Sequence, residues 1–200
     1  MGRGLQDRVL LWADVETGGL TPNIKGPEYL LEIALIPTNA TGKEVLAEPT
    51  EYVMHFPQDE VEWMKEKVDP VVLDMHEESG LWTRVSDPHY GFPTYKELDE
   101  ALLEYISEFA PRPREARLAG SNVGFDLNFV EVFLPSFYSH LHYQSLDVSS
   151  LYFVAETYGI DIDDRISQSK HNAMSDIARS LETYRRFVRK TGLSGRLKEW

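Results

Sequence analysis

The sequence predicts an α/β protein in which a mixed central sheet is flanked by helices. Two observations support this. Three apolar, strand-like segments come first, at 8–13, 29–37 and 43–56, and strand and helix patterns alternate afterwards. The early strands are expected to be antiparallel neighbours. With 200 residues, 42% of them hydrophobic, the chain suits one domain spanning 1–200, with its core at about 8–190.

The first apolar segment, 8–13, has the pattern of a buried strand and runs directly into Asp14 and Glu16. Successive side chains of a strand point to opposite faces, so these two acids, two positions apart, face the same side. Gly18 and Gly19 follow. We expect these glycines to let the backbone of another molecule approach the acids.

Further strands are predicted along the chain. The segment 29–37 is a second apolar strand, whereas Pro49 makes 43–56 an edge or interrupted strand. In the second half, 117–120 and 143–148 are expected to add two more strands to the sheet.

Two helices in the middle of the chain have clear start signals. Asp69 followed by Pro70 combines a capping residue with proline at the first helical position. Thr94 and Glu97 form a capping box, which opens an amphipathic helix that Pro111 ends.

The second half alternates strand exits with helices. Asp126 lies at the turn from the strand 117–120 into a helix that ends at Pro135. Ser149 is predicted to cap a later helix, which Gly159 stops. Asp126 is thus an isolated carboxylate that stands where a strand ends.

The last helix is predicted from about 172 to 190, because apolar residues recur every three to four positions. These residues are Ala173, Ile177, Leu181, Tyr184 and Val188. His171 lies at the start of this helix, and Asp176 lies one turn inside it. An imidazole beside a carboxylate suits a site where a metal and a general base cooperate.

Four acids stand at strand ends or helix starts, where the sites of open α/β sheets gather. They are Asp14, Glu16, Asp126 and Asp176. Carboxylate oxygens favour Mg²⁺ or Mn²⁺ over zinc. Two such ions can clamp the attacking and leaving oxygens of a phosphodiester displacement, with His171 as the base for water. The sequence therefore predicts phosphodiester hydrolysis.

Composition narrows the range of partners and compartments. The absence of cysteine excludes disulfides and thiolate zinc sites. No apolar run approaches the length of a membrane helix, and we expect a cytoplasmic protein without membrane partners. A net charge of -13 argues against a large surface for long DNA, but not against a small nucleic acid held through cations.

Three motifs in this order resemble the DEDDh 3′-to-5′ exonucleases of the ribonuclease H-like fold. They are Asp14-x-Glu16, Asn122-x-x-Phe125-Asp126 and His171-x-Ala173-x-x-Asp176. Within that superfamily the chain most resembles the oligoribonucleases. The supporting residues include Trp12, His76-x-x-Ser79-Gly80-Leu81, Arg84-Val85, His142-Tyr143 and Leu146-Asp147-Val148-Ser149.

This resemblance implies hydrolysis of short oligoribonucleotides to 5′-mononucleotides with two divalent ions. Asp14 would bridge both ions, and Glu16 and Asp176 would complete the shell of one. Asp126 would serve the other ion, and His171 would be the general base.

The resemblance also implies substrate contacts. Leu20 would wedge between bases, His76 would lie against the 3′-terminal nucleotide, and Asn122 belongs to the third-acid motif. A partner subunit would cap the 5′ phosphate with Tyr143, Gln144 and Ser149. The family usually has arginine where this chain has Gln144, which weakens the implied preference for dinucleotides.

A homodimer is implied in the same way. For its interface we expect an apolar stretch made of Phe133, Leu134, Phe137, Tyr138 and Leu141. Two alternatives to the RNA reading remain open. One is a DEDDh exonuclease acting on DNA 3′ ends, and the other is a catalytically silent nucleotide-binding protein.

Overall fold

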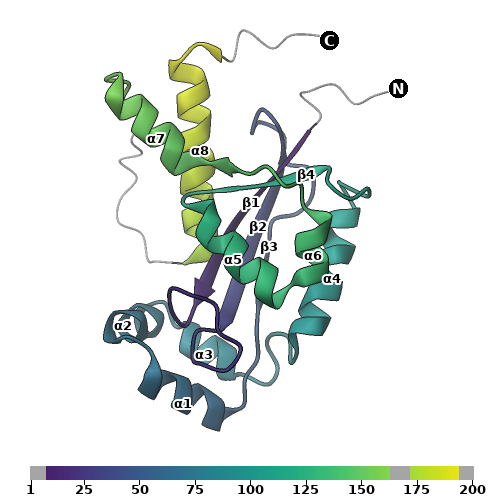
Figure 1. Ribbon diagram of the computed structural model, residues 1–200, viewed down its shortest axis with the longest axis vertical. Helices are drawn as coiled ribbons and strands as arrows, with labels where there is room; N and C mark the ends of the chain where they lie inside the picture. The colour runs from purple at the N-terminus through teal and green to yellow at the C-terminus, as the bar shows by residue number, and fades with distance from the viewer. Residues whose placement is uncertain (1–7, 163–171, 194–200) are drawn as a thin grey trace.

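The structure, a computed structural model, describes residues 8–162 and 172–193 (Figure 1). The strands are β1 Val9–Thr17, β2 Leu30–Asn39, β3 Thr50–Val53, β4 Ala116–Gly120 and β5 Leu146–Asp147. The helices are α1 Gln58–Lys67, α2 Pro70–Glu78, α3 Leu81–Ser86, α4 Tyr95–Ser107, α5 Val123–Phe133, α6 Pro135–His140, α7 Val148–Thr157 and α8 Ala173–Lys190. Within these ranges, no helix is long and apolar enough to cross a membrane.

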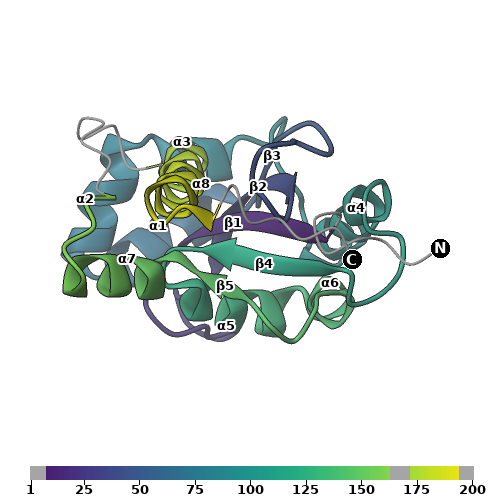
Figure 2. The ribbon, with the colours of Figure 1, turned by 90° about the horizontal axis from the view of Figure 1, so that it is seen from above.

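Among the described residues the strands form one five-stranded sheet in the order β3-β2-β1-β4-β5. β1, β2 and β3 pair antiparallel, whereas β4 lies parallel to β1 and β5 lies parallel to β4. Figure 2 shows α8 over one face of this sheet and α5 and α6 against the other. The predicted mixed sheet with flanking helices is therefore confirmed.

The central strand β1 is buried on both faces, and its alternating side chains divide the core. Leu11 and Val15 belong to the larger apolar cluster, which α4, α5 and α6 complete. Leu10 and Trp12 point the other way, into a smaller cluster built with α8. Any side chain at an even position of β1 therefore faces α8.

The predicted helix caps are largely confirmed. The Asp69 side chain accepts a hydrogen bond from the Val71 amide at 2.9 Å, and the Thr94 side chain accepts one from the Glu97 amide at 3.2 Å. The prediction for α7 was wrong: its cap is Asp147, whose side chain accepts from the Ser149 amide at 2.8 Å. A carboxylate two residues earlier takes the position because β5 ends there.

The outer strands are shorter than predicted. β3 begins immediately after Pro49, so only the last part of the segment 43–56 forms a strand pair with β2. β5 contains two residues, Leu146 and Asp147, and the expected strand from 143 is not formed. The chain before β5 is exposed, with Tyr143 at 80%. Edge strands have one neighbour and keep less of their apolar pattern.

The apolar stretch that was predicted for a dimer interface lies in the core instead. Phe133, Leu134, Phe137 and Leu141 are all buried in the larger cluster. These residues close α5 and form α6, a short helix whose start is capped by the buried Asp99. The Asp99 carboxylate accepts from the Ser136 and Phe137 amides at 3.0 and 2.8 Å. This stretch is therefore unavailable to a partner.

Candidate active site

Three of the four predicted acids meet where β1 ends. Asp14 and Glu16 occupy even positions of β1 and so face α8, and the first turn of α8 carries Asp176. One oxygen of each carboxylate lies within 4.8 Å of the others. The helix cap that fixes this turn is Asn172, whose side chain accepts from the Ser175 amide at 2.9 Å.

Asp126 approaches the same strand from the other side of the sheet. It lies in the first turn of α5, is buried, and accepts a hydrogen bond from the Val15 amide at 3.0 Å. The register of β4 against β1 ends at Trp12, which leaves the Val15 amide without a strand partner on that side. Asp126 thus lies beside β1 between the positions of Asp14 and Glu16, and its role as a metal ligand stays a prediction.

The crowded carboxylates hold their protons unusually tightly. Burial, with the neighbouring Asp176, raises the pKa of Asp14 to about 7. Burial, followed by the charges of Asp14, Glu32 and Asp176, raises the pKa of Glu16 to about 8. The pKa of Asp126 is raised well above its usual range, mainly by burial and then by Asp14. Positive charge placed among these groups would relieve their repulsion.

The donor set fits Mg²⁺ or Mn²⁺. Every group that converges here offers a carboxylate oxygen, which these hard cations prefer, and the sequence has no thiolate to compete. Asp14, Glu16 and Asp176 would hold such an ion.

Two arginines partly offset the negative charge of the clustered acids. The sequence analysis assigned this role to neither of them. Arg179 pairs with Asp176 at 3.0 Å, and its charge lowers the pKa of Asp14. Arg84 pairs with Glu32 at 2.6 Å and with Glu51 at 2.5 Å, and its charge lowers the pKa of Glu16. The ion pairs of Arg84 and Arg179 therefore adjoin the acids of the site and influence their charge.

Glu32 is a further buried acid that the sequence analysis did not single out. It lies opposite Glu16 in the register of β1 and β2 and is fully buried. Burial is the main cause that raises the pKa of Glu32 to about 7, although Arg84 opposes the shift. An isolated glutamate within the apolar segment 29–37 was the signal that could have revealed it.

His76 is placed next to the acids but is fully buried. Its Nε2 atom lies 2.8 Å from the Thr17 carbonyl oxygen, and its Nδ1 atom lies 3.9 Å from a Glu16 oxygen. The ring packs edge-on against Trp82. In this structure His76 fixes the end of β1, and its predicted contact with a nucleotide stays a prediction. His171, the predicted base, lies outside the described residues.

The other predicted substrate residues lie in two places. Leu20 follows β1 and is 83% exposed, which leaves it open to a ligand. The Asn122 amide donates to Asp147 and to the Ser149 hydroxyl, so Asn122 and Ser149 are in contact. Tyr143 and Gln144 precede β5, away from the carboxylates. Their predicted roles require a ligand or a partner subunit that reaches them.

The glycines after Glu16 do not leave space for another molecule's backbone, contrary to expectation. A methyl group on Gly18 would lie 1.8 Å from the Pro27 carbonyl oxygen of the same chain. The Gly18 amide also donates to the Tyr29 carbonyl at 2.9 Å. These glycines instead let the loop before β2 fold back against the end of β1.

The raised pKa values predict how the stability of the metal-free protein depends on pH. Each group binds its proton more tightly when the chain is folded, so its contribution is complete below the unfolded values of 3.8 and 4.5. That contribution is lost as the pH rises through about 7 for Asp14 and about 8 for Glu16. In EDTA we therefore expect the melting temperature to fall as the pH rises from about 4 to about 8.

Metal binding should reverse this trend, because bound ions need deprotonated carboxylates. We expect Mn²⁺ to raise the melting temperature more at about pH 8.5 than at about pH 5. Asp14→Asn combined with Glu16→Gln serves as the control. In this variant both the melting temperature in EDTA and its increase with Mn²⁺ should depend less on pH. A metal-free melting temperature that rises across this range would contradict the electrostatic picture.

Comparison with known proteins finds relatives that are named oligoribonucleases. It is 32% identical to a probable oligoribonuclease of Schizosaccharomyces pombe over 172 residues, which are 86% of this chain and 64% of that protein. It is also 32% identical to an oligoribonuclease of Rhodococcus jostii, over 94% of this chain and 88% of that protein. The chain thus spans just under two thirds of the first relative's length. No family model matches the sequence.

Solved structures agree on the fold. Ligand-free exonuclease I superposes with a TM-score of 0.65 at 15% identity, covering 93% of this chain and 43% of that one. Escherichia coli exonuclease I bound to a 5cy-dT13 oligonucleotide gives a TM-score of 0.62 at 17% identity, covering 93% and 41%. This likeness confirms the ribonuclease H-like fold that the sequence motifs implied.

Proposed function

The chain belongs to the oligoribonuclease family of 3′-to-5′ exonucleases, and we propose that it hydrolyses short oligoribonucleotides from the 3′ end to 5′-mononucleotides. One observation carries this proposal. Asp14, Glu16 and Asp176 converge within 4.8 Å at the end of β1, in a setting that raises the pKa of the first two. Such a cluster suits binding of divalent cations beside a phosphodiester.

In this proposal two Mg²⁺ or Mn²⁺ ions, once bound, would neutralise the phosphodiester and make a water molecule easier to deprotonate. Asp14, Glu16, Asp126 and Asp176 would hold the ions and would thereby align the 3′-terminal phosphodiester. Asp126 and Asp14 reach the site from opposite faces of β1, and the hydrogen bond from the Val15 amide fixes Asp126. Arg84 and Arg179 limit the repulsion among the acids.

We assign the general base to His171, which precedes the cap of α8 by one residue. A base there would take the proton of the attacking water, and a leaving 3′ oxygen would accept a proton from solvent. Leu20, exposed in the loop that follows β1, would separate the last two bases. His76 would act on the terminal nucleotide through Glu16 and Thr17, which it contacts.

A second candidate function is exonuclease action on DNA 3′ ends. The observation that favours it is the superposition on exonuclease I, one structure of which holds a 5cy-dT13 oligonucleotide. Turnover of matched RNA and DNA oligomers in Mn²⁺ separates the two candidates. Faster hydrolysis of RNA supports the proposal, and faster hydrolysis of DNA overturns it. Absence of turnover on both would favour a silent nucleotide-binding protein.

We also propose a homodimer, with an interface that differs from the one first expected. Around α7 and its C-terminal end, several large apolar side chains are exposed. They are Tyr152, Phe153, Val154 and Tyr158. Exposed apolar side chains around the helix that carries Ser149 suit a second copy of the chain, which would bring Tyr143, Gln144 and Ser149 toward the partner's acids.

The change Phe153→Asp should dissociate this dimer, because it places a charge where the partner's apolar surface would bury it. Sedimentation at micromolar concentration should show the parent protein at twice the mass of the 23.0 kDa chain and the variant at that mass. Val132→Asp, on the exposed face of α5, is the matched control and should leave the dimer intact. A monomeric parent protein would contradict the proposal.

Gln144→Arg should sharpen the preference for dinucleotides. An arginine offers a bidentate, charged grip on a terminal phosphate, whereas glutamine offers one neutral donor group. The gain of about 1–2 kcal/mol corresponds to roughly five- to thirtyfold in discrimination. The measurement is the ratio of kcat/KM for a 5′-phosphorylated dinucleotide and pentanucleotide. An unchanged ratio would show that position 144 does not face the phosphate.

A further inference from the structure

Arg179 contacts the cluster of acids directly. Its Nη1 atom lies 3.0 Å from an oxygen of Asp176, three residues earlier on α8, and within residues 8–162 and 172–193 it pairs with no other carboxylate. Its charge also lowers the pKa of Asp14, which belongs to the same cluster. The guanidinium therefore supplies positive charge to two of the three acids that converge at the end of β1.

Arg84, which also lies near the acids, differs in its contacts. It pairs with Glu32 of β2 and Glu51 of β3, and neither of these belongs to the converging cluster. Arg84 therefore influences the cluster through its charge alone. Arg179, in contrast, occupies one of the carboxylates that would hold a cation.

Arg179 and a divalent cation would share the single negative charge of Asp176. A guanidinium nitrogen lies about 2.8 Å from the oxygen it pairs with, and Mg²⁺ lies about 2.1 Å from its ligand oxygens. The two positive groups would then be roughly 4–6 Å apart. Like charges at that separation repel even in a dielectric close to that of water. A cation at the acids should therefore weaken the pair between Asp176 and Arg179.

A hollow of about 250 Å³ beside Arg179 offers its guanidinium another position. Besides Arg179 itself, its lining includes the hydroxyl groups of Ser121, Ser149, Ser180 and Thr183. The Ser121 and Ser180 oxygens lie 2.9 Å apart. A guanidinium has donors alone, and each hydroxyl oxygen accepts hydrogen bonds. We call this space between α7 and α8 the hydroxyl hollow.

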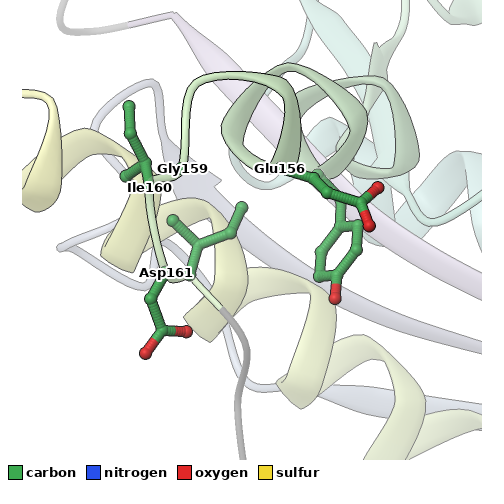
Figure 3. A pocket seen from close by; sticks show the side chains of 6 residues that line it. Glu156, Gly159, Ile160 and Asp161 are labelled. Atoms are coloured by element: carbon green, nitrogen blue, oxygen red, sulfur yellow. The ribbon is translucent and has the colours of Figure 1, made fainter.

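Negative charge adjoins the hydroxyl hollow. Tyr152 lines it and also lines a second hollow, of about 320 Å³, beside the end of α7. The lining of the second hollow includes the carboxylates of Glu156 and Asp161 (Figure 3). These carboxylates favour a cationic group over an anion on this side of α7.

We propose that Arg179 is an internal counter-ion of the acids, which leaves Asp176 and turns into the hydroxyl hollow when a divalent cation binds. This inference rests on the metal site of the proposed function, and it adds a residue that sets how tightly that site holds its ions. Arg179 then has two opposite effects. It stabilises the metal-free fold by pairing with an acid, and it weakens cation binding by competing for that acid. A residue with a purely structural role would show the first effect alone.

The test compares Arg179→Gln with the parent protein at about pH 8.5, above the pKa values of about 7 for Asp14 and about 8 for Glu16. At this pH, protons compete little with a cation for the acids. Calorimetric titration measures Mn²⁺ binding without substrate. We expect the dissociation constant of Mn²⁺ to fall about tenfold, because one positive charge beside a divalent ion is removed from a largely solvated site. The melting temperature in EDTA should fall by roughly 1–3 °C.

Arg189→Gln is the matched control. It removes the same charge from the same helix, from a side chain that pairs with Glu182 at 3.7 Å, and should leave the dissociation constant of Mn²⁺ unchanged. Arg179→Lys keeps the charge and should stay close to the parent in both measurements. If Arg179→Gln does not fold, Arg179→Met replaces it with the same expectation, since methionine keeps an unbranched apolar stem on the helix.

Asp14→Ala separates failure of this inference from failure of the proposed function. If the parent binds Mn²⁺ more tightly than Asp14→Ala does, the proposed metal site stands. A dissociation constant in Arg179→Gln that equals or exceeds that of the parent then overturns the inference alone. If the parent binds Mn²⁺ no better than Asp14→Ala, the proposed function and the inference are both overturned.

Discussion

Asp14→Ala should reduce turnover of short oligoribonucleotides by at least about a thousandfold, the upper range for losing one electrostatic group of an active site. Asp14 lies between the other acids: it faces Asp176 across to α8, and its charge raises the pKa of both Glu16 and Asp126. Its loss would therefore weaken the hold of the remaining carboxylates on both ions. The measurement is kcat in saturating Mn²⁺.

The variant should remain folded, because removing one of several crowded carboxylates lowers their mutual repulsion. Its melting temperature in EDTA should equal or exceed that of the parent at about pH 8. Asp74→Ala, which removes an exposed acid of α2, is the control and should keep full activity. A folded Asp14→Ala protein with activity close to that of the parent would rule out the proposed metal site.

His171→Ala should lower turnover by roughly two to four orders of magnitude, the range for a positioned general base. Substrate affinity should change little, because the histidine acts on water and not on the nucleotide. The two effects are read separately from kcat and from binding of a heptaribonucleotide. His89→Ala, at an exposed histidine, should leave both unchanged. Lost affinity with preserved turnover would make His171 a substrate contact instead.

The sequence allowed the site to be predicted wherever local rules decide the geometry. The two-residue spacing of Asp14 and Glu16 placed both on one face of β1, and the apolar period of α8 turned Asp176 toward that face. The caps at Asp69 and Thr94 are confirmed because each depends on hydrogen bonds within three residues.

What escaped prediction depends on contacts between distant segments. The ion pair of Arg84 with Glu32 joins α3 to β2, and neither residue signals the other in the sequence. The stretch from Phe133 to Leu141 looked like an interface because an apolar run is the same in a core and on a surface. Pairing of β1 with β4 likewise aligned Arg117 with Leu10.

The central claim is metal-dependent removal of nucleotides from the 3′ end of short RNA. The most direct measurement incubates a 5′-labelled pentaribonucleotide with the protein in Mn²⁺ and, separately, in excess EDTA. We predict a ladder of labelled products that shortens one nucleotide at a time from the 3′ end in Mn²⁺, release of 5′-mononucleotides, and an intact oligomer in EDTA. Equal hydrolysis in EDTA, or an immediate cut within the chain, would contradict the account.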